Sequence, residues 1–355
     1  MRSEENKRLS QPSEAFGGST SHQMPPLSLV KSLMGVPLTL STYVAAKIGI
    51  ADILKDGPRT CEDVAQAAGV NPQALYRLMR MLVAIGLLTE ADGRHFNLTP
   101  HGRYLQADHP GSLRDLAIMV GEKWHLRPWT DLFESVRTGE PAFNRLYGMG
   151  FFQYLSENPQ AASLFGRAMH IMVDRFAAAV AAACDLRGVS CVVDVGGGHG
   201  TLLAEILLRH SGVRGVLFDA HAVIDGGAKH LELLGISSRC AKVAGDFFES
   251  VPEGGDVYIL SRVLHDWDDD RAVTILRNCR RAMGQSGRIL VVEVVVGPSP
   301  SFYASWLDLE MLVNFGGRER TEAEYGQLFE RAGLRVVKVV PTNSPFSVIE
   351  GVAQS

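Results

Sequence analysis

The pattern of apolar and polar residues changes character along the chain, and each change marks a different kind of structure. Between residues 28 and 110, apolar residues recur at helical intervals, as Leu75, Met79 and Leu82 do. Residues 111–185 keep a helical pattern and are rich in Phe and Trp, which we expect to pack in a core or, in part, to line an aromatic pocket. After residue 190, short apolar runs of strand length alternate with helical segments.

The N-terminal region predicts the order helix, turn, helix, hairpin. Thr60, with an acid three residues later, has the spacing of a capping box at the start of a short helix, which Gly69 ends. Asn71 caps the next helix, and its proline neighbour suits a first helical turn. Asp92-Gly93 then joins two short strands as a hairpin turn. This order is typical of a winged helix.

The C-terminal region predicts an α/β fold with a doubly wound, mainly parallel, Rossmann-like sheet, because strands and helices alternate. Such sheets bind ligands beyond the carboxyl ends of their strands. The intervening helices are expected at 201–210, 268–283 and 322–333. The expected strands are 191–195, 215–219, part of 241–248, 256–261 and 288–296, with a possible closing hairpin pair at 334–340 and 346–352.

Composition narrows the class of protein. The 355 residues are 46% hydrophobic and 21% charged, as in an ordinary globular protein of two domains. A net charge of −4 gives no general attraction to nucleic acid or to anionic membranes. The five cysteines are odd in number and form no C-x-x-C pair, which predicts neither disulfides nor a zinc site, and favours reduced thiols in a cytoplasmic enzyme. Neither a signal peptide nor an apolar stretch of membrane-spanning length is recognisable.

The most specific motif is DVGGGHG, which runs from Asp194 to Gly200 between a strand and a helix. Glycines allow a tight turn and close approach of a ligand to the backbone. The glycines Gly196 and Gly198 are followed by Gly200, two residues on, so the spacing departs from the dinucleotide fingerprint, which would need its last small residue at Thr201. This tighter spacing is less suited to a pyrophosphate. A glycine loop alone is weak evidence for a cofactor site, but its position between a strand and a helix strengthens that interpretation.

Two further segments fit a nucleoside. Asp219 ends the next strand, where a carboxylate can accept both ribose hydroxyls, although a helix cap or a loop acid is the simpler interpretation of an isolated aspartate. In Gly245-Asp246-Phe247-Phe248, Asp246 can accept from an adenine amino group and Phe247 can stack on the ring. Ordinary core packing is the alternative for the two phenylalanines.

The segment LSRVLHDWDDD, residues 260–270, follows the fourth strand and places His265 near the carboxyl edge of the sheet. Imidazole titrates near neutral pH and can act as a general base. Glu293, in an apolar strand, and Glu319, in GGRERT after a glycine pair, are candidate acids that orient this base. The alternatives are a buried structural ion pair for Glu293 and a surface loop acid for Glu319.

The strings DVGGGHG, GDFF, LHDW and GGRERT, in this order and spacing, resemble the small-molecule O-methyltransferase family. That family includes plant caffeic acid and isoflavone methyltransferases, hydroxyindole methyltransferases and bacterial enzymes that act on polyketides and phenazines. The resemblance covers roughly residues 30–350 and identifies the winged helix as a dimerisation domain. It implies S-adenosylmethionine as cofactor, a homodimer and no metal requirement.

The resemblance also implies roles for individual residues. His265 would deprotonate the substrate hydroxyl while Glu293 and Glu319 hold its ring. In plant members a lysine stands at the position of Ser261, which leaves that residue's contact open. The implied cofactor contacts are Asp194, Gly196, Gly198, Asp219, Asp246, Phe247, Ser261 and Trp267. The implied substrate contacts, for which helix core is the alternative, are Met169, Met172, Phe176 and Asn314.

The sequence thus predicts an S-adenosylmethionine-dependent O-methyltransferase that acts on a small aromatic hydroxy compound of secondary metabolism. Alternatives are N-methylation, a diverged family member with other chemistry, and a winged-helix DNA-binding regulator. Arg77 and Arg80 are the only basic residues of helix 72–85, which favours a dimer interface over a DNA face. The expected parts are a disordered leader at 1–25, a dimerisation domain at 26–110, a helical substrate-pocket region at 111–185 and a catalytic domain at 186–355.

Overall fold

The computed structural model describes residue 29, residues 32–299 and residues 301–354. The predicted leader at 1–25 lies outside these residues. The chain divides into two units, residues 1–38 and 39–355, and the second contains nearly all of the helices and strands. Its first helix, α2 (Gly35–Ile48), begins shortly before this unit. No helix among the described residues is long and apolar enough to cross a membrane.

The N-terminal elements confirm the winged-helix order. The Thr60 hydroxyl accepts a hydrogen bond from the Asp63 amide, the Asn71 side chain accepts one from the Ala74 amide, and Gly69 ends its helix with a φ of 66°. The hairpin gains a third, unpredicted strand, β1, which pairs with β3. The elements are α3 (Ile50–Ile53), β1 (Arg59–Thr60), α4 (Cys61–Ala68), α5 (Pro72–Ala84), β2 (Leu88–Ala91) and β3 (His95–Leu98).

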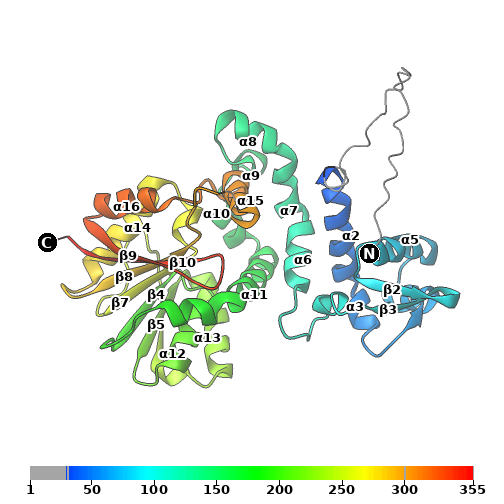
Figure 1. The fold of residues 1–355 in the computed structure, drawn as a ribbon, viewed down its shortest axis with the longest axis horizontal. Coiled ribbons are helices and arrows are strands. Elements are labelled where there is room, and N and C mark those ends of the chain that lie inside the picture. Colours follow the sequence, from blue (N-terminus) through cyan, green and yellow to red (C-terminus); the bar gives the residue numbers. More distant parts are fainter. Residues whose placement is uncertain (1–28, 30–31, 300, 355) are drawn as a thin grey trace, which may run out of the picture. The chain divides into compact units, whose positions relative to one another are not determined.

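The C-terminal part is built on a seven-stranded sheet in the order β6-β5-β4-β7-β8-β10-β9 (Figure 1). The strands from β6 to β8 are parallel, and β10 is antiparallel to both β8 and β9, so the closing hairpin inserts its second strand next to β8. The strands are β4 (Cys191–Val195), β5 (Arg214–Asp219), β6 (Cys240–Ala244), β7 (Val257–Ser261), β8 (Arg288–Glu293), β9 (Leu334–Pro341) and β10 (Ser347–Ala353).

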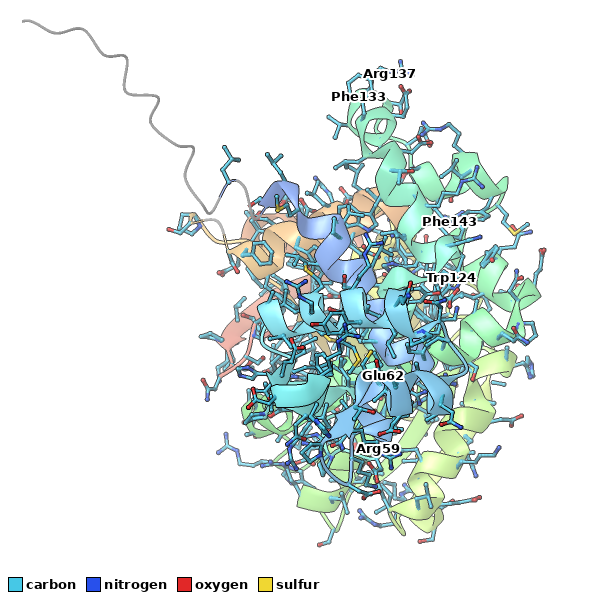
Figure 2. All side chains as sticks on the ribbon, turned by 90° about the vertical axis from the view of Figure 1, so that its right-hand side faces the viewer. Arg59, Glu62, Trp124, Phe133, Arg137 and Phe143 are labelled. Atoms are coloured by element: carbon cyan, nitrogen blue, oxygen red, sulfur yellow. The ribbon has the colours of Figure 1, made fainter. Side chains whose placement is uncertain are left out.

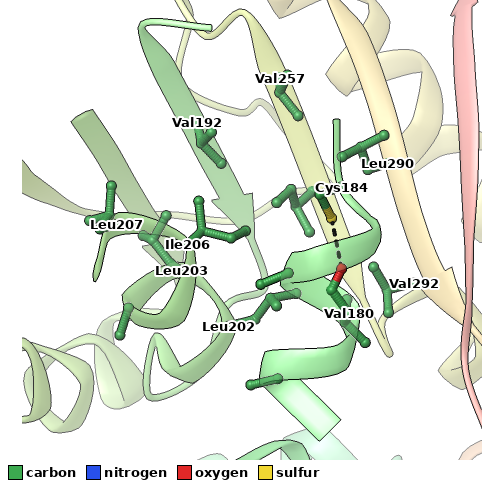
Figure 3. Packing of buried hydrophobic residues seen from close by; sticks show 14 of the residues in the cluster. Val180, Cys184, Val192, Leu202, Leu203, Ile206, Leu207, Val257, Leu290 and Val292 are labelled. Atoms are coloured by element: carbon green, nitrogen blue, oxygen red, sulfur yellow. Dashed lines mark hydrogen bonds between the residues drawn. The ribbon is translucent and has the colours of Figure 1, made fainter. Parts of the chain in front are cut away.

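Helices cover both faces of this sheet. Because successive side chains of a strand point to opposite faces, Val192 packs with α11, α12 and α13, while Val193 packs with α14 and α16. Figure 3 shows the first of these cores, in which the Cys184 thiol also donates to the Val180 carbonyl. The helices are α11 (Pro159–Ala183), α12 (Thr201–Arg209), α13 (His221–Leu233), α14 (Asp269–Ala282), α15 (Phe302–Glu310) and α16 (Glu322–Arg331).

The predicted helical region 111–185 contains several short helices before α11. Trp124, Phe143 and Phe151 form its aromatic core, as expected, but Phe133 is 75% exposed and points outward beside Arg137 on α8 (Figure 2). The elements are α6 (Arg114–Gly121), α7 (Lys123–Leu126), η3 (Arg127–Asp131), α8 (Leu132–Thr138), α9 (Ala142–Tyr147) and α10 (Phe151–Glu157).

Candidate active site

The glycine loop connects β4 to α12 at the carboxyl edge of the sheet. Gly196, Gly198 and Gly200 have φ values of 70°, 57° and 69°, in the left-handed region that favours glycine. A Cβ added at Gly196 would lie 2.8 Å from Val263 Cγ2, whereas one at Gly198 would meet no described atom within 4 Å. The loop is therefore packed on one side and open on the other, as a ligand cradle requires.

Two aspartates hold or face this loop. Asp219 accepts from the Gly198 amide through Oδ2 and from the Ala220 amide through Oδ1, both at 2.7 Å, so it fixes the loop conformation. Asp194 is only 1% exposed, and its Oδ1 has no hydrogen-bond partner among the described residues. Burial, with a contribution from Asp219, raises the pKa of Asp194 to about 7. An unpartnered buried carboxylate oxygen at a glycine cradle fits a cofactor that carries cationic and hydrogen-bond donor groups.

The other predicted cofactor residues gather around the same edge. Phe247 Cε1 lies 3.6 Å from a Cβ built on Gly196, and its ring centroid lies 6.1 Å from that of Trp267. Asp246 accepts from the Phe248 amide at 2.8 Å, which holds the turn after β6. Ser261 is the last residue of β7. The structure therefore brings Phe247 to the glycine loop, whereas Asp246 contacts its own turn.

The predicted catalytic residues meet in the protein interior. His265 Nδ1 lies 2.7 Å from Glu319 Oε1 and 3.5 Å from Glu293 Oε2, and these side chains are at most 2% exposed. Glu293 Oε1 also accepts from the amides of Val263 and Leu264 at 3.0 and 2.9 Å. The expectation that Glu293 lies mid-strand was wrong: β8 ends at Glu293, so its carboxylate can turn toward the next loop and bind amides there.

Charge at this cluster is governed by burial. Burial raises the pKa of Glu293, and it also raises the pKa of Glu319. Asp266, which the sequence analysis did not single out, lies with its Oδ1 3.5 Å from His265 Nε2, and burial raises its pKa to about 7. The imidazole is thus flanked by carboxyl groups at both nitrogens.

Ligand atoms of His265, Glu293 and Glu319 lie within 4.8 Å of one another, a spacing that invites comparison with a metal site. Two ligands on one zinc ion at about 2.0–2.1 Å each are separated by roughly 3.3 Å in tetrahedral geometry. The 2.7 Å between Nδ1 and Oε1 is shorter and is the normal length of a charge-assisted hydrogen bond. A shared proton accounts for this pair better than a cation does.

Arg320 connects the loop that carries His265 to the loop that carries Glu319. It was not predicted from the sequence. Its fully buried guanidinium donates to the carbonyls of Leu264 and Trp267 at 3.0 and 2.8 Å and pairs with Asp269. Gly317 explains how closely the loops approach, since a Cβ there would lie 2.0 Å from the His265 carbonyl oxygen. The glycine pair before Glu319 was the only sequence signal of this contact.

The four predicted substrate residues differ in their surroundings. Met169 Sδ lies 3.5 Å from Arg262 Nη2, so it faces the loop that carries His265. Phe176 packs edge-on against Phe346 and the sheet core, and Met172 is half-buried on α11. Asn314 is fully buried in a π-helix, η6 (Met311–Phe315).

Sequence reasoning missed Arg262, whereas it expected part of residues 111–185 to line an aromatic pocket. Arg262 adopts a φ of 57°, a conformation uncommon outside glycine, and the Nε of this arginine lacks a hydrogen-bond partner in the described part of the chain. Phe152 stacks on Trp267, with ring centroids 5.4 Å apart and planes 29° apart, and contacts Phe315 at 5.7 Å. An aromatic wall of Phe152, Phe315 and Trp267 therefore stands beside the turn that carries His265.

Comparison with known proteins identifies the family of both parts of the chain. The O-methyltransferase domain model matches residues 129–335, and the O-methyltransferase dimerisation domain model matches residues 38–108. The chain is 43% identical to phenazine O-methyltransferase PhzM of Lysobacter antibioticus, covering 92% of this chain and 96% of the relative. It is 37% identical to the mitomycin biosynthesis 6-O-methyltransferase of Streptomyces lavendulae, covering 90% and 92%.

Solved structures give the same result. The crystal structure of LaPhzM matches with a TM-score of 0.90 at 42% identity, covering 92% of this chain and 99% of that one. The O-methyltransferase NcsB1 from neocarzinostatin biosynthesis, in complex with S-adenosylmethionine and 2-hydroxy-5-methyl naphthoic acid, matches with a TM-score of 0.81 at 36% identity, covering 91% and 98%. The chain therefore belongs to the family of S-adenosylmethionine-dependent O-methyltransferases that carry an N-terminal dimerisation domain.

Proposed function

We propose that this protein methylates a hydroxyl of a small aromatic molecule of secondary metabolism, with His265 as the general base. The observation that carries the proposal is the 2.7 Å contact between His265 Nδ1 and Glu319 Oε1 at the carboxyl edge of the sheet. A carboxylate on Nδ1 selects the tautomer in which Nδ1 is protonated and Nε2 keeps its lone pair.

The chain's own residues would handle the proton. His265 Nε2 takes the proton of the substrate hydroxyl, a step that typically contributes about 10²–10⁴-fold to the rate. Glu293 keeps the turn in place through the Val263 and Leu264 amides. Asp266, 3.5 Å from Nε2, would stabilise the imidazolium that forms.

S-adenosylmethionine would supply a methyl group that its sulfonium already activates. The open glycine cradle and the unpartnered Asp194 oxygen support binding at this loop. The residues proposed to hold the cofactor are Asp194, Gly196, Gly198, Asp219, Asp246, Phe247, Ser261 and Trp267.

The acceptor is proposed to be a planar aromatic compound. The wall of Phe152, Phe315 and Trp267 offers stacking surface beside the base. Similar proteins are named for phenazine and naphthoate substrates, which supports a fused-ring acceptor. Relatives named as N-methyltransferases keep a nitrogen acceptor as the second candidate. The residues proposed to line the substrate pocket are Met169, Met172, Phe176 and Asn314.

We also propose that the protein is a homodimer through its N-terminal domain and acts in the cytoplasm. The dimerisation domain match at residues 38–108 supports the first, and the five free cysteines support a reducing compartment. The proposed parts of the chain are a leader at 1–25, a dimerisation domain at 26–110, a substrate-pocket region at 111–185 and a catalytic domain at 186–355. Sedimentation of the purified chain tests the dimer.

The reaction is tested with wild type, His265→Ala and His101→Ala, the last an exposed histidine as matched control. Calorimetry measures binding of S-adenosylmethionine and S-adenosylhomocysteine, and mass spectrometry follows methyl transfer to a panel of aromatic hydroxy and amino compounds. We expect all three proteins to bind cofactor and only His265→Ala to lose transfer. Equal transfer by His265→Ala would refute the base, and transfer to amino compounds alone would favour N-methylation.

A further inference from the structure

A second buried histidine–glutamate pair lies outside the catalytic cluster. His125 Nε2, on α7, is 2.8 Å from Glu310 Oε1, on α15, and both side chains are at least nine-tenths buried. Trp129 Nε1 donates to Glu310 Oε2 at 2.9 Å, and Asn314 Nδ2 donates to Oε1 at 2.9 Å. Glu310 therefore receives three donors that come from three different elements.

These donors fix the charge of Glu310. Burial alone would raise the pKa of Glu310, but His125, Asn314 and Trp129 outweigh it and hold that pKa below its ordinary value. An ionised carboxylate only accepts hydrogen bonds. Asn314 must therefore turn its NH₂ group toward Glu310. The ionised Glu310 carboxylate thus sets the orientation of the Asn314 amide.

The amide orientation leaves Asn314 Oδ1 facing away from Glu310. This oxygen is buried, and no described residue donates a hydrogen bond to it. A buried acceptor without a donor is destabilising by about 1–3 kcal/mol, so such an atom usually meets a ligand or water.

Asn314 lies on an element that borders the proposed acceptor site. Asn314 belongs to η6, which packs against the turn η5 (Leu264–Asp266) that carries His265. Its neighbour Phe315 contacts Phe151 and Phe152 at 4.3 and 5.7 Å between ring centroids, and Phe152 stacks on Trp267. Asn314 thus precedes a residue of the aromatic wall in the chain, on an element that packs against the turn of the base.

We propose that Glu310, held by His125 and Trp129, is a positioning residue that points the Asn314 carbonyl oxygen at the acceptor substrate. The site then selects aromatic hydroxy compounds that carry a second hydrogen-bond donor, a hydroxyl or an amino group, over matched compounds that carry an ether there. This inference rests on the proposed function, because it assumes an aromatic acceptor beside His265.

The test measures ligand binding, so that it does not depend on turnover. Calorimetry compares a dihydroxynaphthalene with the matching methoxynaphthol on protein loaded with S-adenosylhomocysteine. Wild type should bind the dihydroxy compound at least about tenfold more tightly. In Glu310→Gln, the new amide can itself donate to Asn314, which frees Asn314 to turn, and the preference should fall to within about twofold.

Three further proteins make the result specific. Asn314→Leu should also lose the preference, because it removes the acceptor, and Trp129→Phe should keep part of it, because two donors remain on Glu310. Glu157→Gln, an exposed acid on α10, should keep the full preference. Circular dichroism confirms folding of each variant, and a role in stability alone would lower both affinities without changing their ratio.

The outcomes separate the two proposals. Equal affinities of wild type for the two compounds, or an unchanged ratio in Glu310→Gln, overturn the role of Glu310 whether or not methyl transfer occurs. Loss of the ratio in Glu310→Gln and Asn314→Leu supports it, even if neither compound is methylated. Methyl transfer in the same samples tests the proposed function separately.

Discussion

Asp194 offers a direct test of how the glycine loop is built. Its carboxylate is almost fully buried, one oxygen is unpartnered within the described residues, and its pKa is raised from 3.8 to about 7. Because the pKa of Asp194 is higher in the folded state, its contribution to the free energy of unfolding is fully present below pH 3.8 and is lost as the pH rises to about 7. Above that pH the folded protein must carry a buried charge.

The size of the effect follows from the two pKa values. At about 1.36 kcal/mol per pKa unit, the full loss is about 4 kcal/mol, of which about 2.5 kcal/mol falls between pH 5 and pH 8. Asp194→Asn keeps the shape and removes the titration. The substitution should therefore raise the free energy of unfolding by about 2.5 kcal/mol more at pH 8 than at pH 5, which is roughly 5–10 °C in Tm.

Thermal unfolding of the cofactor-free protein at both pH values measures this difference. Asp225→Asn, at an exposed acid on α13, is the matched control and should give the same Tm shift at pH 5 and pH 8. If Asp194→Asn also shifts Tm equally at the two pH values, Asp194 does not titrate in this range, and the reasoning from its burial is refuted.

Three other predictions concern the catalytic loops. In His265→Asn, kcat should fall by about 10²–10⁴-fold while the calorimetric Kd for S-adenosylmethionine stays unchanged. Burial raises the pKa of Glu319, and a protonated Glu319 opposes the productive tautomer of His265, in which Nδ1 carries the proton and Nε2 is free. Glu319 loses its proton only as the pH increases, so kcat/KM should rise with pH and level off on the alkaline side. Glu319→Gln should flatten that profile, and a profile identical to wild type would contradict the coupling. Arg320→Met leaves two buried carbonyls without their donor, so urea denaturation should show a loss of about 3 kcal/mol, and a loss near zero would mean that Arg320 does not join the loops.

The sheet was predictable because its central strands are buried on both faces. Such strands are continuous apolar runs, and β4 was predicted with its observed bounds. Helix α13 was missed because Gly226 and Gly227 weaken any helical pattern. The structure explains them, since a Cβ at Gly227 would lie 2.5 Å from Leu217 Cδ2 and 2.9 Å from the Gly198 carbonyl. Close packing against the glycine loop outweighs the low helix propensity of glycine at that point.

The site was predictable only where one short segment carries its chemistry. His265 and Glu319 stand in recognisable strings, and the structure places His265 Nδ1 2.7 Å from Glu319 Oε1. The pair of His125 and Glu310 joins segments that are 185 residues apart. Arg320 lies in a loop with several other charged residues, and nothing in the sequence distinguishes it from them. Long-range pairing of this kind leaves no local pattern, so it had to come from the tertiary structure.

The carboxyl edge of the sheet concentrates acids whose ionised forms are disfavoured by burial. Burial raises the pKa of Asp194, Asp266, Glu293 and Glu319, so each ionised form opposes folding in the absence of ligand. The same groups surround the two places where the proposed reaction needs positive charge: the sulfonium cofactor at the glycine loop and the imidazolium at His265. Acids that destabilise the empty site become favourable when it fills, because a nearby cation lowers their pKa values. We therefore propose that the same burial that disfavours these ionised acids in the free protein strengthens cofactor binding and proton transfer to His265.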